Sequence, residues 1–285
     1  MLSLLFGITA ALCWGVHDVC VRSVAARSGP ALSFLVVLAS GTLFLLPLAL
    51  FHGGWGAVGL ANGTLGLLSG LLYAAGGYSL YRAFEIGPVR LVAPLIGTYP
   101  VLSLLWAAFQ GTPPSLPQAF AVLAIVIGVG LNAALSDHGD GTHADRATRL
   151  KAAILWSLAG CTGFALTFAV GQAASLQGGG LALILISRLG AFIGLLAAAL
   201  TLRAPLPLRG APYPLLAIMG LCDATALGLV QIAGTLPRPE FAAVASSTFG
   251  MITVLLAWAF LKEKMSPPQW GAVALVFAGI GYLAL

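Results

Sequence analysis

Ionisable side chains inside long apolar runs are the first candidates for chemistry in this chain. His17 and Asp18 are neighbours in the first run, and Arg188 and Asp223 lie in two consecutive later runs. A guanidinium can hold a carboxylate through two hydrogen bonds, and an aspartate can hold a proton or an ammonium group. Because ionisable groups are costly in apolar surroundings, each is expected to have a function or a charged partner. These residue types predict a site for protons and for the charged ends of small organic molecules.

Structural roles remain open for the same residues. Arg188 and Asp223 lie at similar depths on helices that are adjacent in the sequence, so they could form an ion pair with each other. His17 and Asp18 could instead satisfy backbone or loop groups near a helix end. We keep both alternatives, and we predict His17, Asp18 and Asp223 as proton or charge-pair sites.

Aromatic and hydroxyl side chains form a second group of candidates, because tyrosine and tryptophan combine a flat apolar face with a polar group. Trp14 shares a face of the first helix with the histidine one turn later. Tyr73 and Tyr99 lie deep in apolar runs, whereas Tyr78 could also belong to an interfacial belt. The hydroxyls at 246–248 can bond a carboxylate or their own helix. The predicted substrate-binding residues are Trp14, His17, Tyr73, Tyr78, Tyr99, Phe168, Arg188, Ser246, Ser247 and Thr248.

Composition places these candidates in a membrane. Of the 285 residues, 60% are hydrophobic and only 7% are charged, and the mean hydropathy is +1.02. A soluble domain carries about 25% charged residues because its surface must face water. The net charge of +5 comes from residues that stand singly or in pairs, without the basic patch that nucleic acid requires. The chain is therefore predicted to have the lipid bilayer, and not nucleic acid, as its partner.

Ten apolar runs are long enough to cross the bilayer as helices, which takes about 20 residues each. The fourth run contains Pro94 and Pro100, which are predicted hinges because proline frees backbone carbonyls and kinks a helix. The sequence thus predicts an all-α integral membrane protein of ten transmembrane helices. The predicted runs are 2–22, 31–51, 62–82, 90–109, 117–135, 151–172, 181–201, 213–234, 239–261 and 268–285.

Lysine and arginine in the short loops predict the orientation. The loops that follow the odd-numbered runs hold eleven of these residues, and the loops on the opposite side hold only Arg238. Cytoplasmic loops carry the excess of positive charge. Both termini are therefore predicted to lie outside the cytoplasm, which is the periplasm for a bacterial inner-membrane protein.

The chain also matches itself. A shift of 151 brings Gln118 onto Gln269 and Gly128 onto Gly279 without a gap, and a shift of 148 aligns 11–15 with 159–163. This predicts a five-helix repeat at 1–135, a polar cytoplasmic connector at 136–150 and a second repeat at 151–285. Because five is odd, the second repeat must be inverted in the membrane. Inverted repeats are typical of alternating-access transporters.

These patterns resemble a known family. The A-x-C-x-G stretches at 11–15 and 159–163, the segment 261–264 and the Pro-Gln helix start at 266–271 are similar to the EamA-type branch of the drug/metabolite transporter superfamily. The segment 110–112 lacks the acidic residue of its counterpart. Within the branch, the chain is most like the aromatic amino-acid exporters of the YddG type. The resemblance implies a basket of helices around a central cavity and export of amino acids or similar metabolites across a bacterial inner membrane.

Other function classes find less support in the sequence. It has no P-loop, no G-x-S-x-G and no H-E-x-x-H motif, so we predict no enzyme, no cofactor and no metal. The four cysteines lie in apolar runs without metal-ligand spacing. The prediction is a secondary transporter for aromatic and other neutral amino acids, and a monomer suffices for it. Drug-like or nucleotide-type substrates, or a lipid-moving or channel-like protein, remain alternatives.

Overall fold

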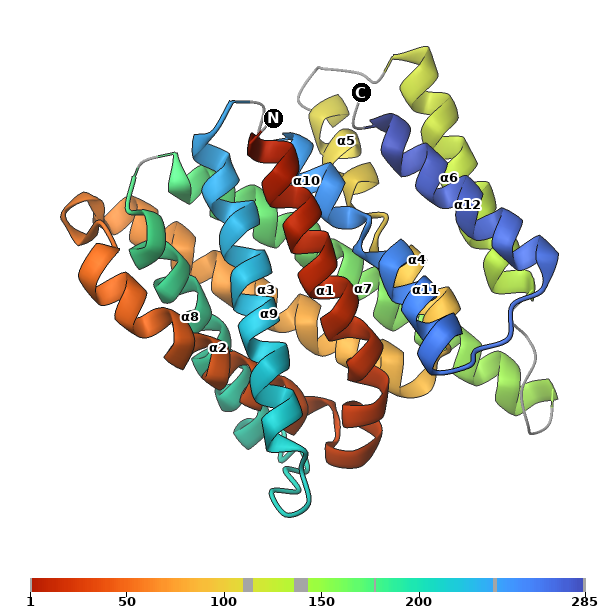
Figure 1. Cartoon of the computed structure of the whole chain (residues 1–285), viewed down its shortest axis with the longest axis horizontal. Coiled ribbons are helices and arrows are strands. Elements are labelled where there is room, and N and C mark those ends of the chain that lie inside the picture. Colours follow the sequence, from red (N-terminus) through yellow and green to blue (C-terminus); the bar gives the residue numbers. More distant parts are fainter. Residues whose placement is uncertain (1, 110–114, 136–142, 177, 238–239, 284–285) are drawn as a thin grey trace.

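The computed structural model describes residues 2–109, 115–135, 143–176, 178–237 and 240–283. Within these ranges the regular structure is entirely helical, which confirms the all-α prediction for them. The helices form a bundle in which the described ends of the chain, at α1 and α12, lie at the same end (Figure 1). Two short 3₁₀ turns are Trp55–Ala57 and Ala233–Thr235. The α-helices are α1 (Leu2–Ser28), α2 (Pro30–His52), α3 (Leu60–Ile86), α4 (Val89–Ile96), α5 (Tyr99–Phe109), α6 (Leu116–Leu135), α7 (His143–Ser175), α8 (Gly180–Thr201), α9 (Tyr213–Ile232), α10 (Glu240–Ser247), α11 (Phe249–Phe260) and α12 (Pro267–Leu283).

The outside of the bundle is apolar. Leu43, Phe120 and Ile193 are 68%, 68% and 60% exposed, and many other large aliphatic side chains share this exposure. Among the described residues, six helices are long and apolar enough to cross a membrane, and two shorter apolar stretches are Val89–Leu102 and Val244–Phe260. A soluble protein seldom exposes so much contiguous apolar surface. The chain is a membrane protein, and ten crossings stay a prediction.

Two of the predicted runs are not continuous helices. The run 90–109 is divided into α4 and α5 at Gly97, and the run 239–261 is divided into α10 and α11 at Thr248. The two breaks are 151 residues apart, which is the shift that aligns the chain with itself. Pro100 is the second residue of α5, where a missing N–H costs little, and Pro94 lies inside α4. Two of the predicted runs are therefore interrupted helices, and the first interruption lies between the predicted hinges Pro94 and Pro100.

Helix α7 begins at His143, so the last part of the predicted connector 136–150 is helical. The segment 136–142 lies outside the described residues. A helix that begins eight residues before the predicted run projects beyond an ordinary membrane span, since each residue adds about 1.5 Å. The predicted connector is therefore partly helical, and the boundaries of the two repeats stay a prediction.

Glycines let the helices approach closely around α3, which packs mainly against α7 and α8. A Cβ on Gly163 of α7 would come within 2.5 Å of the Cα of Gly76 in α3. Helices α6 and α12 pair in the same way, because Gly128 lies against the carbonyl of Ala272 and Gly279 against the carbonyl of Ala121. Such contacts are how membrane helices gain packing energy, since lipid gives no hydrophobic drive between them.

Candidate functional site

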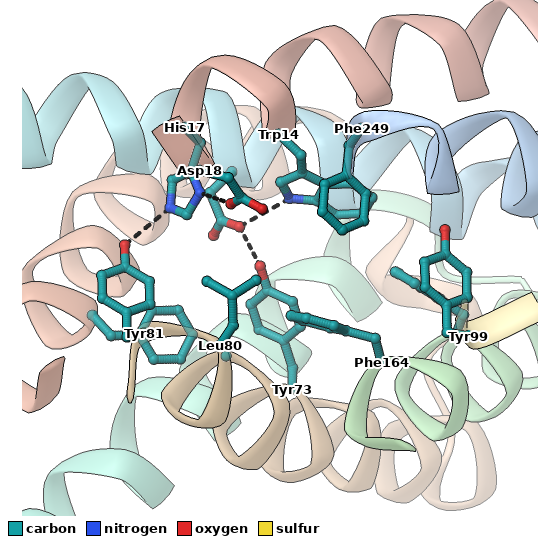
Figure 2. A pocket seen from close by; sticks show the side chains of 13 residues that line it. Trp14, His17, Asp18, Tyr73, Leu80, Tyr81, Tyr99, Phe164 and Phe249 are labelled. Carbon is teal, nitrogen blue, oxygen red and sulfur yellow. Dashed lines mark hydrogen bonds and ion pairs between the residues drawn. The ribbon is translucent and has the colours of Figure 1, made fainter. Parts of the chain in front are cut away.

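A small buried cavity lies among helices α1, α2, α3, α5, α7, α9 and α11 (Figure 2). Its volume open to water is about 20 Å³, which is on the order of one water molecule. The structure is therefore closed around the site, and a larger solute requires the helices to separate. Its lining is aromatic and acidic: Trp14, His17, Asp18, Phe34, Tyr73, Gly77, Leu80, Tyr81, Tyr99, Phe164, Phe168, Asp223 and Phe249.

Asp223 of α9 is the centre of the first polar cluster. Its Oδ2 accepts a hydrogen bond from Nη1 of Arg188 at 2.9 Å. Its Oδ1 accepts from Nε1 of Trp14 at 3.2 Å and from the hydroxyl of Tyr73. All four side chains are buried. The carboxylate thus joins α1, α3, α8 and α9, and its charge is balanced by the guanidinium.

Arg188 does not line the cavity. Besides Asp223, its guanidinium donates from Nη2 to the carbonyl of Val37 at 3.4 Å. A Cβ at Gly41 of α2 would collide with Nη2, so the absence of a side chain there makes room for the guanidinium. The alternative of an internal ion pair describes the geometry of Arg188 in this closed structure. Its predicted role in substrate binding remains untested.

His17 and Asp18 of α1 form a second polar cluster beside the first (Figure 2). Nδ1 of His17 and Oδ1 of Asp18 are 2.6 Å apart, and Nε2 of His17 lies 3.0 Å from the hydroxyl of Tyr81. Both residues of α1 are buried, at 3% and 1% exposure. Among the described residues, Oδ2 of Asp18 has no hydrogen-bond partner. A buried oxygen of this kind is a vacant acceptor at the wall of the cavity.

Rings make up most of the remaining wall. The ring centroid of Trp14 lies 5.7 Å from that of Phe168 and 6.1 Å from that of Phe249. Tyr99 lies 5.1 Å from Phe168, and its hydroxyl is 2.6 Å from Oγ of Ser246. These separations are typical of interacting aromatic pairs. The rings therefore pack on one another across α1, α5, α7 and α11, and close the cavity.

Some predicted residues lie elsewhere. The hydroxyls of Ser247 and Thr248 each donate to a carbonyl of their own helix, at 2.7 Å, so the alternative that they bond back is the one observed. Tyr78 lines a separate cavity of about 250 Å³ between α2, α3 and α8, with its ring 5.9 Å from that of Trp156. That second cavity is lined mainly by alanine and leucine. These three predicted residues do not line the aromatic cavity.

Other lining residues were missing from the predicted set. Tyr81 follows Tyr73 and Gly77 at four-residue spacing on α3, so helical periodicity could have identified it. Phe249 directly follows the break at 248, but a break is not visible in the sequence. Phe34 on α2 has no sequence signal that separates it from ordinary packing residues.

A third polar cluster joins the start of α4 to α1 and to the loop between α11 and α12. The carboxylate of Glu263 accepts the backbone N–H of Val89 at 3.1 Å and that of Arg90 at 3.2 Å. It therefore caps the N-terminus of α4, where a negative charge is favourable. The guanidiniums of Arg22 and Arg90 lie 3.8 Å and 3.9 Å from the same carboxylate. Glu263 thus ties the α11–α12 loop to α1 and α4.

These features define the protein class: a helical membrane protein whose apolar exterior surrounds a buried aromatic and ionisable site. The family model for EamA-like transporters matches residues 1–134 and again residues 151–285. The chain belongs to the EamA-like transporter family. The narrower likeness to exporters of the YddG type stays a prediction.

Two further similarities agree with this assignment. An uncharacterized transporter of Archaeoglobus fulgidus is 28% identical over 162 residues, which are 56% of this chain and 57% of that protein. The chain thus matches little more than half the length of that relative. A solved structure described only as "Crystal structure of protein" has a TM-score of 0.69 at 16% identity, and the match covers 98% of this chain and 95% of that one. This last likeness concerns the fold alone.

Proposed function

We propose that this chain is a secondary transporter that exports small polar organic molecules, with aromatic and other neutral amino acids as the first candidates. The observation that carries the proposal is the position of the closed cavity. Helices α1, α2, α3 and α5 fall in the first family match, and α7, α9 and α11 fall in the second. A site between two halves is exposed to either side when the halves rock against each other.

Reciprocal contacts support two halves with a related structure. Gly128 lies against Ala272, and Gly279 lies against Ala121. Ala121 and Ala272 are related by the same shift of 151 as the two glycines. Each contact therefore repeats the other with the two halves exchanged. A two-fold relation between halves produces such pairs. The breaks at Gly97 and Thr248 also fall at related positions, and interrupted helices in corresponding places are a pointer to transporter binding sites.

Closure at one end fits the proposal of alternating access. Glu263 joins the α11–α12 loop of the second half to the start of α4 in the first half. In an opening motion at this end, the capped backbone of α4 would separate from that carboxylate. The lysines and arginines gather at this same end, which supports a cytoplasmic location for it. We propose a bacterial inner-membrane location with both termini on the periplasmic side.

The test is the flux of labelled phenylalanine, tryptophan, threonine and methionine in proteoliposomes. We expect saturable flux with mutual competition, and a loss of about tenfold or more in Trp14→Ala and Tyr99→Ala, because each removes a large part of the aromatic wall. Tyr78→Ala is the matched control, since this tyrosine lies in the other cavity and should retain flux.

The contradicting results are distinct. Folded protein that moves none of these amino acids but moves drug-like or nucleotide-type solutes would overturn the substrate and keep the transporter. Flux without saturation, or lipid exchange without solute competition, would favour a channel-like or lipid-moving protein. An equal loss in Tyr78→Ala would show that the loss reports folding and not the cavity.

A further inference from the structure

The vacant oxygen of Asp18 is the most informative feature of the cavity. Oδ1 of this carboxylate is close to His17, and among the described residues Oδ2 has no partner although Asp18 is 1% exposed. A buried acceptor without a donor destabilises the folded state, and more strongly when it is charged. A ligand that brings an N–H donor to this oxygen would remove that cost.

The charges around the cavity favour a cationic donor. Arg188 and Asp223 compensate each other, and the guanidinium does not line the cavity. When His17 is neutral, the carboxylate of Asp18 is the one charge among the described cavity residues that is not paired. A buried carboxylate without a cation is unfavourable. In that state the fixed charge beside the cavity is negative, and an ammonium group balances it. A protonated His17, 2.6 Å from Oδ1 of Asp18, would balance the same charge from the other side and leave Oδ2 as an acceptor only.

The polar donors at the wall are poorly placed for a carboxylate ligand. Nε1 of Trp14 and the hydroxyl of Tyr73 both donate to Asp223. Arg188 donates to the same residue. Asp223 thus occupies Arg188, whose guanidinium the sequence made a candidate for binding a substrate carboxylate. A carboxylate on the solute would have to displace it.

The rings complete the argument. Eight aromatic side chains, among them Trp14, Tyr73 and Phe168, line the same small space as Asp18. The faces of aromatic rings attract cations, and more strongly where water is excluded. They also stack on a flat apolar part of a ligand. Rings together with one vacant carboxylate oxygen match an aromatic amine.

We propose that this cavity recognises the ammonium group of an aromatic amine, with Oδ2 of Asp18 accepting an N–H and the rings surrounding the cation and the aromatic part. The inference rests on the proposed transport function and specifies its substrate class. Amino acids bind through the same ammonium group, and their carboxylate is not required. The cavity of about 20 Å³ widens when the ligand enters.

The experiment uses three probes that share one phenyl ring and differ in charge. Phenethylamine carries the ammonium alone, 3-phenylpropionate the carboxylate alone, and phenylalanine both. Binding to the purified full chain in detergent is measured from the rise of the apparent Tm with probe concentration, because a ligand that binds the folded state stabilises it. We expect phenethylamine and phenylalanine to stabilise the protein, and 3-phenylpropionate to leave its Tm unchanged.

Asp18→Asn tests the residue itself, since it keeps the shape and removes the charge. We expect phenethylamine to bind about 10- to 100-fold more weakly, which is the range for losing a hydrogen bond to a charged group. Glu85→Gln is the matched control, because this glutamate pairs with Arg82 and lies outside the cavity. If the asparagine variant does not fold, Asp18→Glu keeps the charge, and the probe series on the unaltered protein decides alone.

Each outcome decides one proposal. Stabilisation by 3-phenylpropionate equal to that by phenethylamine overturns ammonium recognition, and so does unchanged amine binding in folded Asp18→Asn. Amine binding in a protein without any flux overturns the transport function and leaves the site intact. Amino-acid flux in a protein that phenethylamine neither stabilises nor inhibits overturns the inference and leaves the transporter intact.

Discussion

The two halves of this chain share helix starts and helix packing but not the polar residues that line the cavity. At the start of α6, Oε1 of Gln118 accepts the N–H of Ser115 at 2.9 Å, and at the start of α12, Oε1 of Gln269 accepts the N–H of Ser266 at the same distance. These caps occupy positions related by the shift of 151. They give the Pro-Gln stretch a physical meaning, because a side chain that bonds the residue three positions earlier fixes where a helix begins.

The first helices of the two halves, α1 and α7, differ in their polar residues. Trp14, His17 and Asp18 in α1 align with Thr162, Ala165 and Leu166 in α7 under the shift of 148. The ionisable residues of α1 therefore have no counterpart in α7, which contributes phenylalanines to the cavity instead. Packing constrains both copies alike, whereas one polar wall is sufficient for a central site. The comparison predicts that mutations at the reciprocal packing contacts of α6 and α12 act equally in the two halves and that site mutations do not.

The largest effect is expected from the buried ion pair. Arg188→Met leaves Asp223 buried without its cation, so we expect a loss of about 3–5 kcal/mol of stability. The double variant Arg188→Met with Asp223→Leu removes both charges and should recover most of this loss. The measurement is thermal unfolding in detergent. A single variant as stable as the double variant would mean that the pair does not hold α8 and α9 together.

The paired glycines should give an intermediate effect that is equal in the two halves. A Cβ at Gly128 or at Gly279 would lie 2.9 Å from a backbone carbonyl of the facing helix, and overpacking costs about 1–3 kcal/mol. We expect Gly128→Ala and Gly279→Ala to lower the apparent Tm by similar amounts.

The related pair Gly130 and Gly281 is the matched control for that comparison. Among the described residues, no other helix or side chain lies within 4 Å of a Cβ added at either position, and alanine favours a helix over glycine by about 0.5–1 kcal/mol. Their alanine variants should be unchanged or slightly more stable. If the apparent Tm of Gly128→Ala differs widely from that of Gly279→Ala, the packing of the two halves is less symmetric than these contacts indicate.

The smallest effect is expected at the helix caps, where it should also be unequal. Gln269 is 4% exposed and donates from Nε2 to the carbonyl of Leu135 at 3.0 Å, besides capping α12. Gln118 caps an exposed helix start. Gln269→Ala should cost about 1 kcal/mol and Gln118→Ala less than about 0.5 kcal/mol. Equal Tm values for the two variants would argue against the contact with Leu135.

Several features of this protein follow from the sequence alone. Apolar runs with few charges require helices, because backbone groups in lipid must bond within their own segment. The Ser-x-Pro-Gln stretches at 115–118 and 266–269 indicate the helix starts that α6 and α12 possess. The ionisable and aromatic candidates were visible because such residues are scarce in apolar runs. Trp14, His17, Asp18, Tyr73 and Asp223 were selected in this way, and all line the cavity.

The tertiary structure decided which partner each group takes. Asp223 meets Trp14 across 209 positions of the chain, and no local pattern predicts that approach. Arg188 is bound to an internal carboxylate, although its residue type fitted a substrate carboxylate equally well. Residue type and periodicity define what a side chain can bond and which face of a helix it occupies. The packing of the helices determines which donors are already used, and among the described residues it leaves Oδ2 of Asp18 without one.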